Sequence, residues 1–338
     1  MKGISLKWRW LLIRRIDKLW PLFLLLIIFC AHLADGRVQQ GFRGKEGINL
    51  LARLLIAPVH PTDQPSNSVI RALSPNCVWP LYPNVGHPKI ILSIVLVSPL
   101  HKSTSKCSRS SMESSMIRSK GTALLFPGYG MGKATLLPYA SLLAQKGFVS
   151  VLVDLPAQGS SGGLHIGYGY LEARYMKALD QYLYSRNLAH GQLILIGLSY
   201  GAAVALDSAA LHLNHLSMVI AIAPFARIEP TVIRYARRYT DLDISASQLH
   251  EAISLDEKKL GYRFAVYSPL KMVSKIHVPV IYVAGENDRL TPLQDIKLLF
   301  RRTTNAKLIV EPDLGHVSLI MNTTLLRTIV DSQIDKMK

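Results

Sequence analysis

LILIGLSYGAA, residues 193–203, is the stretch of sequence that decides the expected fold. Its apolar run is typical of a buried parallel strand and is too short for a buried helix. The small residues after Gly201 indicate the start of a helix. Ser199 therefore lies on a sharp turn between strand and helix, which lifts its hydroxyl out of the sheet. Gly197 and Gly201 suit this turn because it brings backbone segments too close together for a Cβ.

Strands and helices alternate on both sides of this turn. Strands that alternate with helices form βαβ units, so we expect an α/β fold with a mostly parallel central sheet and helices on both faces. The predicted strands are residues 89–97, 121–126, 148–155, 192–196, 218–223, 278–284 and 307–310. The predicted helices are residues 133–146, 168–184, 202–213, 295–301 and 319–336.

Breaks in this alternation predict the domain organisation. Residues 35–88 are rich in proline and are expected to form an N-terminal extension, with a short helix within residues 47–59. Residues 89–338 would form the main domain. Within it, residues 98–120 are dense in serine and lysine and predict an exposed loop. The stretch from about 227 to 263 is polar and helical, which predicts a small helical cap inserted over one edge of the sheet.

The first 34 residues are basic and then apolar. Cations precede an uncharged apolar run from Leu19 to Ala34, an order typical of a signal peptide. The run is shorter than the ~20 residues that span a bilayer comfortably. Residues 1–34 are therefore predicted to be a signal peptide or an N-terminal membrane anchor, with cleavage left open. The protein is expected to be exported or membrane-associated, on the periplasmic or extracytoplasmic side.

The net charge of the chain is +17 at pH 7. A basic surface attracts anionic lipids and nucleic acids. The sequence contains no nucleic-acid motif, however, and its cations are scattered outside two clusters. We therefore expect no nucleic-acid partner, and membrane association only through the N-terminal segment. The oligomeric state is not predicted.

The three cysteines form no Cys-x-x-Cys motif, which disfavours metal or redox chemistry. In an exported chain Cys77 and Cys107 could form a disulfide, and two free thiols are the open alternative. His212 and His215 lack a third ligand, so no metal site is predicted. No cofactor is predicted.

A serine nucleophile needs a base that takes its proton and an acid that orients the base. His316 follows the last predicted strand, and histidine titrates near neutral pH, which suits the base of Ser199. The loop after the strand at 278–284 offers two acids, Glu286 and Asp288. Asp288 lies deeper in the loop and is the preferred acid, whereas Glu286 would be a structural loop acid. Asp313, close before the histidine, is a weaker candidate and is expected to be a turn residue.

Acyl transfer also develops negative charge on an oxygen, which needs backbone N–H donors fixed in advance. The turn at Ser199 presents the N–H of Tyr200, and Tyr129, between two glycines, would present the second N–H. The stretch around Tyr129 is similar to a nucleotide-binding P-loop. Pro127 and Ala134 stand where a P-loop has glycine and Ser or Thr, so nucleotide binding is not expected.

The order Ser199, Asp288, His316, together with the two turns, resembles the α/β-hydrolase fold superfamily. Within it the chain resembles the serine-hydrolase branch that includes monoacylglycerol-lipase-like and serine-aminopeptidase-like proteins. DLPAQGSSG, residues 154–162, is similar to the family's Asp-x-x-Gly-His-Gly-x-Ser loop. The resemblance spans residues 89–335 and implies an α/β-hydrolase fold.

The resemblance also implies roles for single residues: Ser199 as nucleophile, Asp288 as acid, His316 as base, and Tyr129 and Tyr200 as backbone oxyanion donors. It implies that the predicted insertion is the family's cap. The apolar residues of this cap would form a partly apolar lid or the core of the lid itself, and they are Ile233, Tyr235, Tyr239, Leu242 and Ile244.

Two departures from the family pattern leave the substrate open. Pro127 replaces a common histidine, and Ala157-Gln158 replaces the Gly-His of the later loop. The expected function is hydrolysis of a carboxylic ester in a small-molecule acyl substrate, through an acyl-enzyme intermediate. Amide or thioester hydrolysis at the same triad is the alternative. A non-catalytic, hydrolase-like binding protein is the alternative hypothesis from a different functional class.

Overall fold

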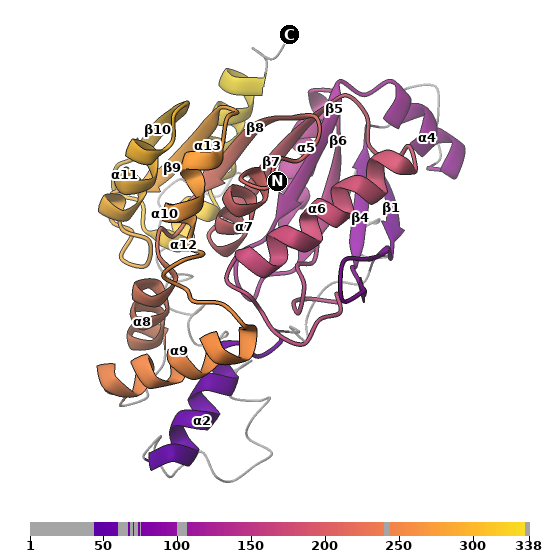
Figure 1. Ribbon diagram of the computed structural model, residues 1–338. Coiled ribbons are helices and arrows are strands. Elements are labelled where there is room, and N and C mark those ends of the chain that lie inside the picture. Colours follow the sequence, from indigo (N-terminus) through magenta and orange to yellow (C-terminus); the bar gives the residue numbers. More distant parts are fainter. Residues whose placement is uncertain are drawn as a thin grey trace, which may run out of the picture.

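The computed structural model describes residues 44–59, 67, 70, 74, 76–99, 107–239 and 244–334. An eight-stranded sheet forms its centre, in the order β1-β4-β6-β5-β7-β8-β9-β10 (Figure 1). The strands are β1 (Cys77–Leu81), β4 (Ile94–Ser98), β5 (Gly121–Phe126), β6 (Phe148–Val153), β7 (Gln192–Leu198), β8 (Leu216–Ile222), β9 (Val280–Gly285) and β10 (Ala306–Glu311). β4 runs antiparallel to β1 and β6, and the other neighbouring strands are parallel. The predicted mostly parallel α/β sheet is confirmed.

Helices cover both faces of this sheet (Figure 1). Successive residues of a strand point to opposite faces. Accordingly, Leu124 and Phe126 of β5 join the core under α6 and α7, while Ala123 and Leu125 join the core under α5 and α13. The helices packed on the sheet are α5 (Leu137–Gln145), α6 (Tyr170–Ser185), α7 (Tyr200–Ala209), α10 (Pro269–Met272), α11 (Leu293–Arg302), α12 (His316–Ile320) and α13 (Thr323–Ile329). Short elements are β2 (Asn84–Val85), β3 (Ile90–Ile91) and the 3-10 turns Lys133–Leu136 and Val273–Lys275.

The sheet begins before the predicted domain boundary at residue 89. β1 pairs with β4 from Cys77 opposite Ser98 to Leu81 opposite Ile94, so part of the proline-rich stretch is a strand of the main sheet. Proline lacks an N–H for the ladder and is tolerated on edge strands, which is the position of β1. Pro80 therefore hid this strand in the sequence.

The predicted exposed loop at residues 98–120 contains a helix, α4 (Arg109–Ile117), and that prediction was wrong in this part. Its serines cap the helix: the Ser108 side chain accepts from the Ser111 N–H, and the Ser111 side chain accepts from the Ser108 N–H. Met112 and Met116 are buried. The serines at the start of this segment therefore cap a helix that buries only a narrow apolar side.

A disulfide joins Cys77 of β1 to Cys107, just before α4. Of the two alternatives that the sequence left open, the structure contains the bonded one. The bond fastens the start of α4 to the edge strand of the sheet.

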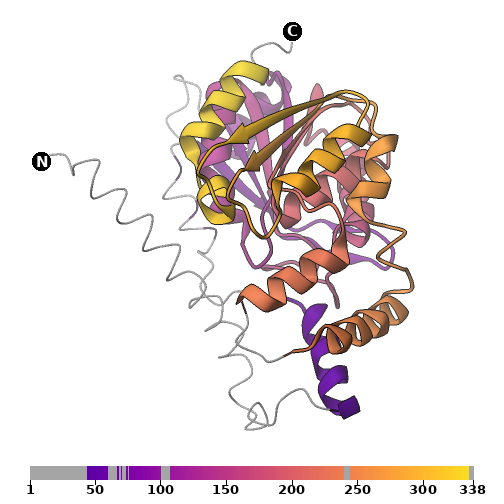
Figure 2. The ribbon, with the colours of Figure 1, turned by 90° about the vertical axis from the view of Figure 1, so that its left-hand side faces the viewer.

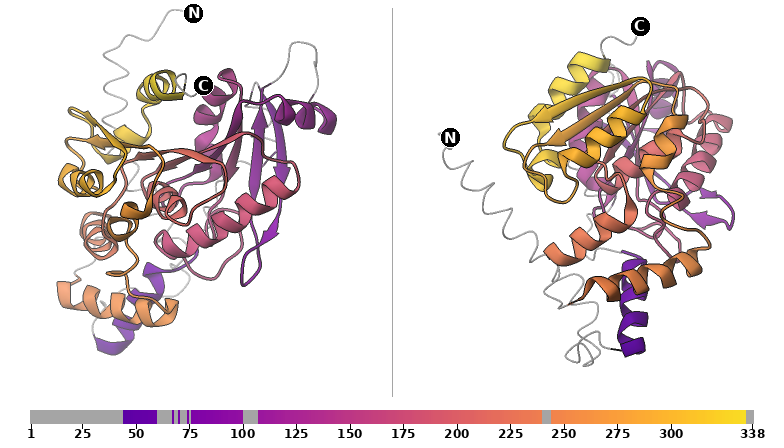
Figure 3. Two further views of the ribbon diagram at one scale, coloured as in Figure 1. Left: turned by 45° about the horizontal axis from the view of Figure 1, so that its top comes forward. Right: turned by 60° about the vertical axis from the view of Figure 1, so that its left-hand side comes forward.

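The stretch predicted as the cap holds two helices, α8 (Ile228–Tyr239) and α9 (Ala246–Leu260). A third helix, α2 (Gly44–Leu55), packs against α9 (Figure 2). Ile48 and Leu51 of α2 share one apolar cluster with Leu249 and Ala252 of α9. The two views of Figure 3 show α2 and α9 together at one end of the molecule, away from the sheet. The helical layer at the predicted cap therefore combines α8 and α9 with a helix from the N-terminal part of the chain.

The predicted C-terminal helix at residues 319–336 is broken. α12 ends at Ile320, and α13 starts at Thr323 because the side chain of Asn322 accepts a hydrogen bond from the Leu325 N–H and caps a new helix. A π-helical turn, Val330–Ile334, follows. The predicted signal peptide or anchor, residues 1–34, lies outside the described residues. Within the described ranges, no helix has the length and apolar character needed to cross a bilayer.

Candidate active site

Ser199 lies between β7 and α7 with φ 51° and ψ −109°. A positive φ in a residue other than glycine costs about 1–3 kcal/mol, and such strain concentrates at functional sites. A Cβ on Gly197 would lie 2.1 Å from the carbonyl oxygen of Gly201, and a Cβ on Gly201 would lie 2.3 Å from that of Phe126. The turn therefore requires both glycines, as predicted, and it presents a half-buried serine at the end of β7.

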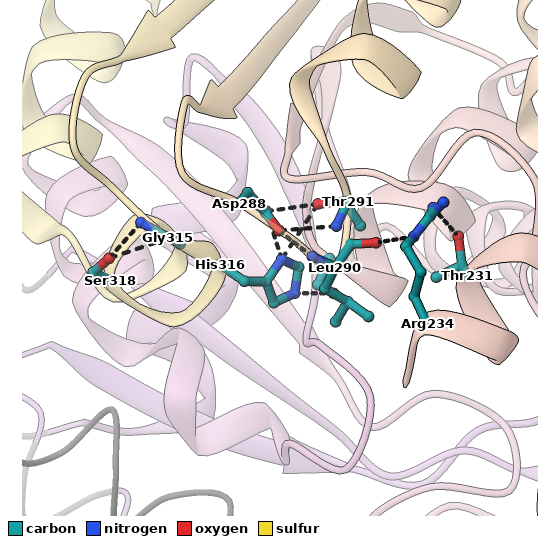
Figure 4. A network of polar contacts seen from close by, with 9 residues as sticks. Thr231, Arg234, Asp288, Leu290, Thr291, Gly315, His316 and Ser318 are labelled. Atoms are coloured by element: carbon teal, nitrogen blue, oxygen red, sulfur yellow. Dashed lines mark hydrogen bonds and ion pairs between the residues drawn. The ribbon is translucent and has the colours of Figure 1, made fainter. Parts of the chain in front are cut away.

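Three side chains from separate loops form one chain of hydrogen bonds. Ser199 Oγ lies 2.8 Å from His316 Nε2. His316 Nδ1 lies 2.7 Å from Asp288 Oδ2 (Figure 4). Because Nδ1–H donates to the carboxylate, Nε2 is left as the acceptor for the Ser199 hydroxyl proton. The structure thus brings together the three residues that the sequence singled out.

The Asp288 carboxylate is buried and receives donors from its own loop. Oδ1 accepts from the N–H groups of Leu290 and Thr291, each at 2.8 Å, and Oδ2 accepts from the Thr291 hydroxyl at 2.7 Å (Figure 4). Burial acts to raise the pKa of Asp288. The hydrogen bond and charge of His316, with the Thr291 donors, outweigh burial and hold this pKa below its ordinary value. The acid is therefore ionised over the neutral range.

Thr291 is a site residue that sequence reasoning missed. The pair Thr291-Pro292 immediately precedes α11, which begins at Leu293, and this position by itself would suggest only a role at the start of the helix. The threonine side chain instead faces Asp288. A Thr three residues after a candidate acid is the signal that could have found it, since hydroxyl side chains commonly bond to nearby acidic groups in turns.

The two other candidate acids lie apart from this chain of hydrogen bonds. Glu286 is exposed, and its backbone N–H donates to the Glu311 carbonyl. Asp313 is exposed and has φ 59° in the turn before α12. Within the described part of the chain, neither carboxylate is a hydrogen-bond partner of His316. The geometry therefore favours Asp288 as the acid.

The turns that carry Tyr129 and Tyr200 lie side by side. They follow the adjacent strands β5 and β7, where Phe126 pairs with Gly197, and their two ring centroids are 6.1 Å apart. Neither backbone N–H has an acceptor among the described residues. The carboxyl ends of parallel strands therefore present two unused donors beside Ser199, as the sequence predicts for an oxyanion site.

Aromatic rings surround these two turns. Tyr235 of the cap helix α8 stands edge-on to Tyr129, with ring centroids 5.5 Å apart. Burial raises the pKa of the Tyr129 phenol to about 12, so this group stays neutral. The Tyr200 hydroxyl donates to the buried carboxyl of Glu172 at 2.7 Å. Of the predicted lid residues, Tyr235 faces the site, Ile233 and Ile244 pack in the cap core, and the side chains of Tyr239 and Leu242 lie outside the described residues.

Arg234 of α8 connects the cap to the acid loop. Its Nε–H donates to the Leu290 carbonyl at 2.8 Å (Figure 4). An Nη2–H of Arg234 donates to Asp295 at 2.7 Å. Leu290 is the residue whose N–H donates to Asp288. No local sequence signal could predict this contact, because it joins residues 56 positions apart.

His212 and His215, which the sequence left without a third ligand, each stack on another ring. His212 stacks on His277, with ring centroids 5.4 Å apart, and His215 stacks on Tyr184. No three His, Cys, Asp or Glu side chains of the described residues gather as a metal site would require.

Comparisons with known proteins agree with the fold described above. Residues 123–325 match the profile of a family described as "Alpha/beta hydrolase family". The uncharacterized protein YqkD of Bacillus subtilis is 26% identical over 219 residues, which cover 64% of this chain and 72% of YqkD. A poly(3-hydroxyalkanoate) depolymerase of Ectopseudomonas oleovorans is 24% identical over 245 residues, covering 61% and 82%. The solved structure of the Pyrococcus furiosus esterase Pf2001 matches with a TM-score of 0.62 at 17% identity, over 83% of this chain and 97% of that one, which shows a common fold.

Proposed function

Because this chain belongs to the alpha/beta hydrolase family and is a hydrolase, we propose that it is a serine hydrolase that cleaves a carboxylic ester. The observation that carries the proposal is the chain of hydrogen bonds from Ser199 through His316 to Asp288. The names of two similar proteins, an esterase and a depolymerase, support hydrolysis and favour an ester.

In the proposed first half-reaction, His316 Nε2 takes the proton of Ser199 as Oγ attacks the ester carbonyl carbon. The imidazole becomes positively charged, and the ionised Asp288 stabilises that charge through Nδ1–H. The carbonyl oxygen becomes an oxyanion, to which the Tyr129 and Tyr200 N–H groups donate. His316 then gives its proton to the leaving alcohol, and an ester of Ser199 remains.

In the second half-reaction, water loses a proton to His316 Nε2 and attacks the acyl-enzyme. The same two N–H groups hold the new oxyanion. Its collapse releases the carboxylic acid and returns the proton to Ser199 Oγ. The site needs no further proton carrier, because one histidine acts as base and then as acid in each half.

The test is the Ser199→Ala variant, assayed with a fluorophosphonate probe and a short p-nitrophenyl acyl ester. We expect loss of covalent labelling and loss of ester turnover, because both need Oγ as nucleophile. Ser185→Ala, at an exposed serine late in α6, is the matched control and should label like the wild type. Full labelling of Ser199→Ala would overturn the nucleophile, and an unlabelled, inactive wild type would favour the hydrolase-like binding protein.

Amide or thioester hydrolysis at the same triad is the second candidate. Esters, thioesters and aminoacyl amides with one common acyl group would separate the three by kcat/KM. The ester proposal expects the highest value for the ester relative to its uncatalysed rate. A higher relative value for the amide would replace it by a peptidase-like function.

We further propose that the protein acts outside the cytoplasm, exported or held at a membrane by residues 1–34. The basic and then apolar order of this segment supports export. The Cys77–Cys107 disulfide supports it independently, because disulfides persist in oxidising compartments. Fractionation of cells with thiol alkylation before lysis tests the proposal: alkylation of both cysteines in a cytoplasmic fraction would overturn it.

A further inference from the structure

The loop after β6, residues 154–162, contacts the turn that carries Tyr129 at two points, both of which come after Tyr129 in the chain. At the first, the Gly130 N–H donates to Gln158 Oε1 at 3.3 Å. At the second, the Lys133 N–H donates to Asp154 Oδ1 at 2.8 Å. The stretch of backbone that presents the Tyr129 N–H is therefore followed at once by two attachments to the same neighbouring loop.

The attachment at Lys133 includes a buried ion pair. Lys133 Nζ lies 2.5 Å from Asp154 Oδ2, and the two side chains are 4% and 0% exposed. Nζ also donates to Ser93 Oγ at 2.9 Å. A buried pair contributes little net stability, because removing both charges from water costs about as much as their attraction returns. Its geometry is nevertheless well defined, and it fixes the position of the turn relative to β6.

The loop is itself held closely around Asp154. Gly159 has φ +57°, and a Cβ there would lie 2.4 Å from Asp154 Cγ. The N–H of Ser160 donates to Asp154 Oδ2 at 3.0 Å, and the Ser161 hydroxyl donates to the Asp154 carbonyl at 2.6 Å. Val59 bridges to the loop from outside, accepting from the Gly159 N–H at 2.9 Å. The loop is thus a firm support for the turn that it contacts.

Gln158 stands out within this support. Its side chain is fully buried, and among the described residues its Nε2 has no hydrogen-bond partner. A buried donor without a partner destabilises the folded state, so folding alone does not explain a glutamine at this position. The one hydrogen bond that the amide makes within the described part is the bond from Gly130. A buried polar group without a partner is unfavourable for folding, and such residues are expected mainly at functional or strained sites.

We propose that Gln158 and the Lys133–Asp154 pair are positioning residues, which fix the Tyr129 N–H in the direction that the oxyanion needs. This inference rests on the proposed function, since it assigns a role in the same reaction. The oxyanion site acts only if its donors are aligned before charge develops. Misplacement by about 1 Å from a change outside the reacting groups can lower the rate about a hundredfold.

The deciding variant is Gln158→Met, which keeps the length of the side chain and removes its acceptor and donor. We expect kcat for the short acyl ester to fall about tenfold to hundredfold with little change in KM. The affinity for a trifluoromethyl ketone, whose adduct with Ser199 carries an oxyanion, should fall by the same factor. The Tm should stay about level, because the unsatisfied Nε2 is removed while the half-buried Gly130 N–H loses its acceptor. Gln158→Asn, which withdraws the acceptor but stays polar, provides a second variant and should show the same two losses.

Thr303→Val is the matched control. Thr303 is buried, lies away from the two turns and is hydrogen-bonded to Tyr282. Loss of this hydrogen bond in Thr303→Val should lower the Tm, while kcat and the ketone affinity stay unchanged. Wild-type kcat and ketone affinity in Gln158→Met would overturn the inference. So would a kcat loss without any loss of ketone affinity. If Ser199→Ala is inactive while Gln158→Met is unchanged, only the positioning role fails; an active Ser199→Ala would refute the proposed function instead.

Discussion

The hydroxyl of Thr291 and Nδ1 of His316 meet at the same oxygen of Asp288, each 2.7 Å from Oδ2. The threonine and the histidine therefore approach the carboxylate from two directions. Thr291 Oγ1 is also 3.3 Å from Nδ1, so the three groups form a closed triangle. The orientation of the base in this site depends on a side chain outside the triad.

Replacing Thr291 by valine, which keeps the shape and removes the hydroxyl, should lower kcat about tenfold with little change in KM. A hydrogen bond to a charged group is worth about 1.5–3 kcal/mol, and part of it aligns the carboxylate. The pKa of Asp288 should move up towards its ordinary value, because one of the groups that lower it is gone. Steady-state kinetics of Thr291→Val and Thr291→Ser check this: the serine variant keeps a hydroxyl and should recover most of the rate.

Arg234 should matter for the substrate complex more than for folding. The arginine is partly exposed, and ion pairs of this kind contribute about 0–1 kcal/mol. Arg234→Met removes the bond to the Leu290 carbonyl and separates α8 from the acid loop. We expect KM to rise severalfold with a small change in Tm. An unchanged KM in Arg234→Met would show that the cap acts independently of the acid loop.

The cap should lose stability as pH rises. Burial raises the pKa of Asp256 in α9 to about 8 from an ordinary value of 3.8, and nearby Lys259 opposes this shift only in part. The folded chain then holds a proton that the unfolded chain releases. Stability from this group is full below about pH 4 and is lost progressively as pH rises towards 8.

The Asp256→Asn variant isolates this effect, because asparagine is similar in shape and stays neutral. Its Tm should match the wild type near pH 4 and exceed it at pH 8. Thermal melts of both proteins across this range provide the measurement. A constant difference in Tm at every pH would mean that Asp256 is ionised in the folded chain.

Reducing the disulfide, or replacing Cys77 and Cys107 together by alanine, should lower the free energy of unfolding by about 3–4 kcal/mol. This figure is the loop-closure entropy for a bond between residues 30 positions apart. The bond lies at the edge strand β1, far along the sheet from β7, so kcat should not change. Denaturant unfolding with and without reductant, with the ester assay beside it, checks both statements. A large loss of kcat in the alanine variant would connect the sheet edge to the site.

Features with a local cause could be predicted from the sequence. The turn at Ser199 needs two glycines within five residues, and each central strand is a continuous apolar run, so both are visible in short windows. Asp288 and His316 follow strands, and parallel strands bring their carboxyl ends to one edge. The co-location of these two residues with Ser199 therefore follows from the alternation of elements.

Features with a tertiary cause could not be predicted in this way. β1 contains Pro80, which argues against a strand unless its place at the sheet edge is known. Arg234 contacts a segment distant in the sequence, and nothing in its own neighbourhood marks it. The sequence marks Gln158 only as a departure from the family's loop, because its bond to Gly130 joins residues 28 positions apart. α4 was hidden for another reason: serines were counted as loop formers, although at a helix start they are caps.

The packing of α2 on α9 has a consequence for modular exchange between relatives. Residues 224–268, moved as one continuous insert into a related hydrolase, would arrive without α2, and the apolar side of α9 that meets Ile48 and Leu51 would face water. A chimera that carries residues 44–59 as well should be soluble where the shorter transplant aggregates. The helical layer of α2, α8 and α9 is assembled from two distant parts of the chain, so a substitution in one part would have to remain compatible with the other.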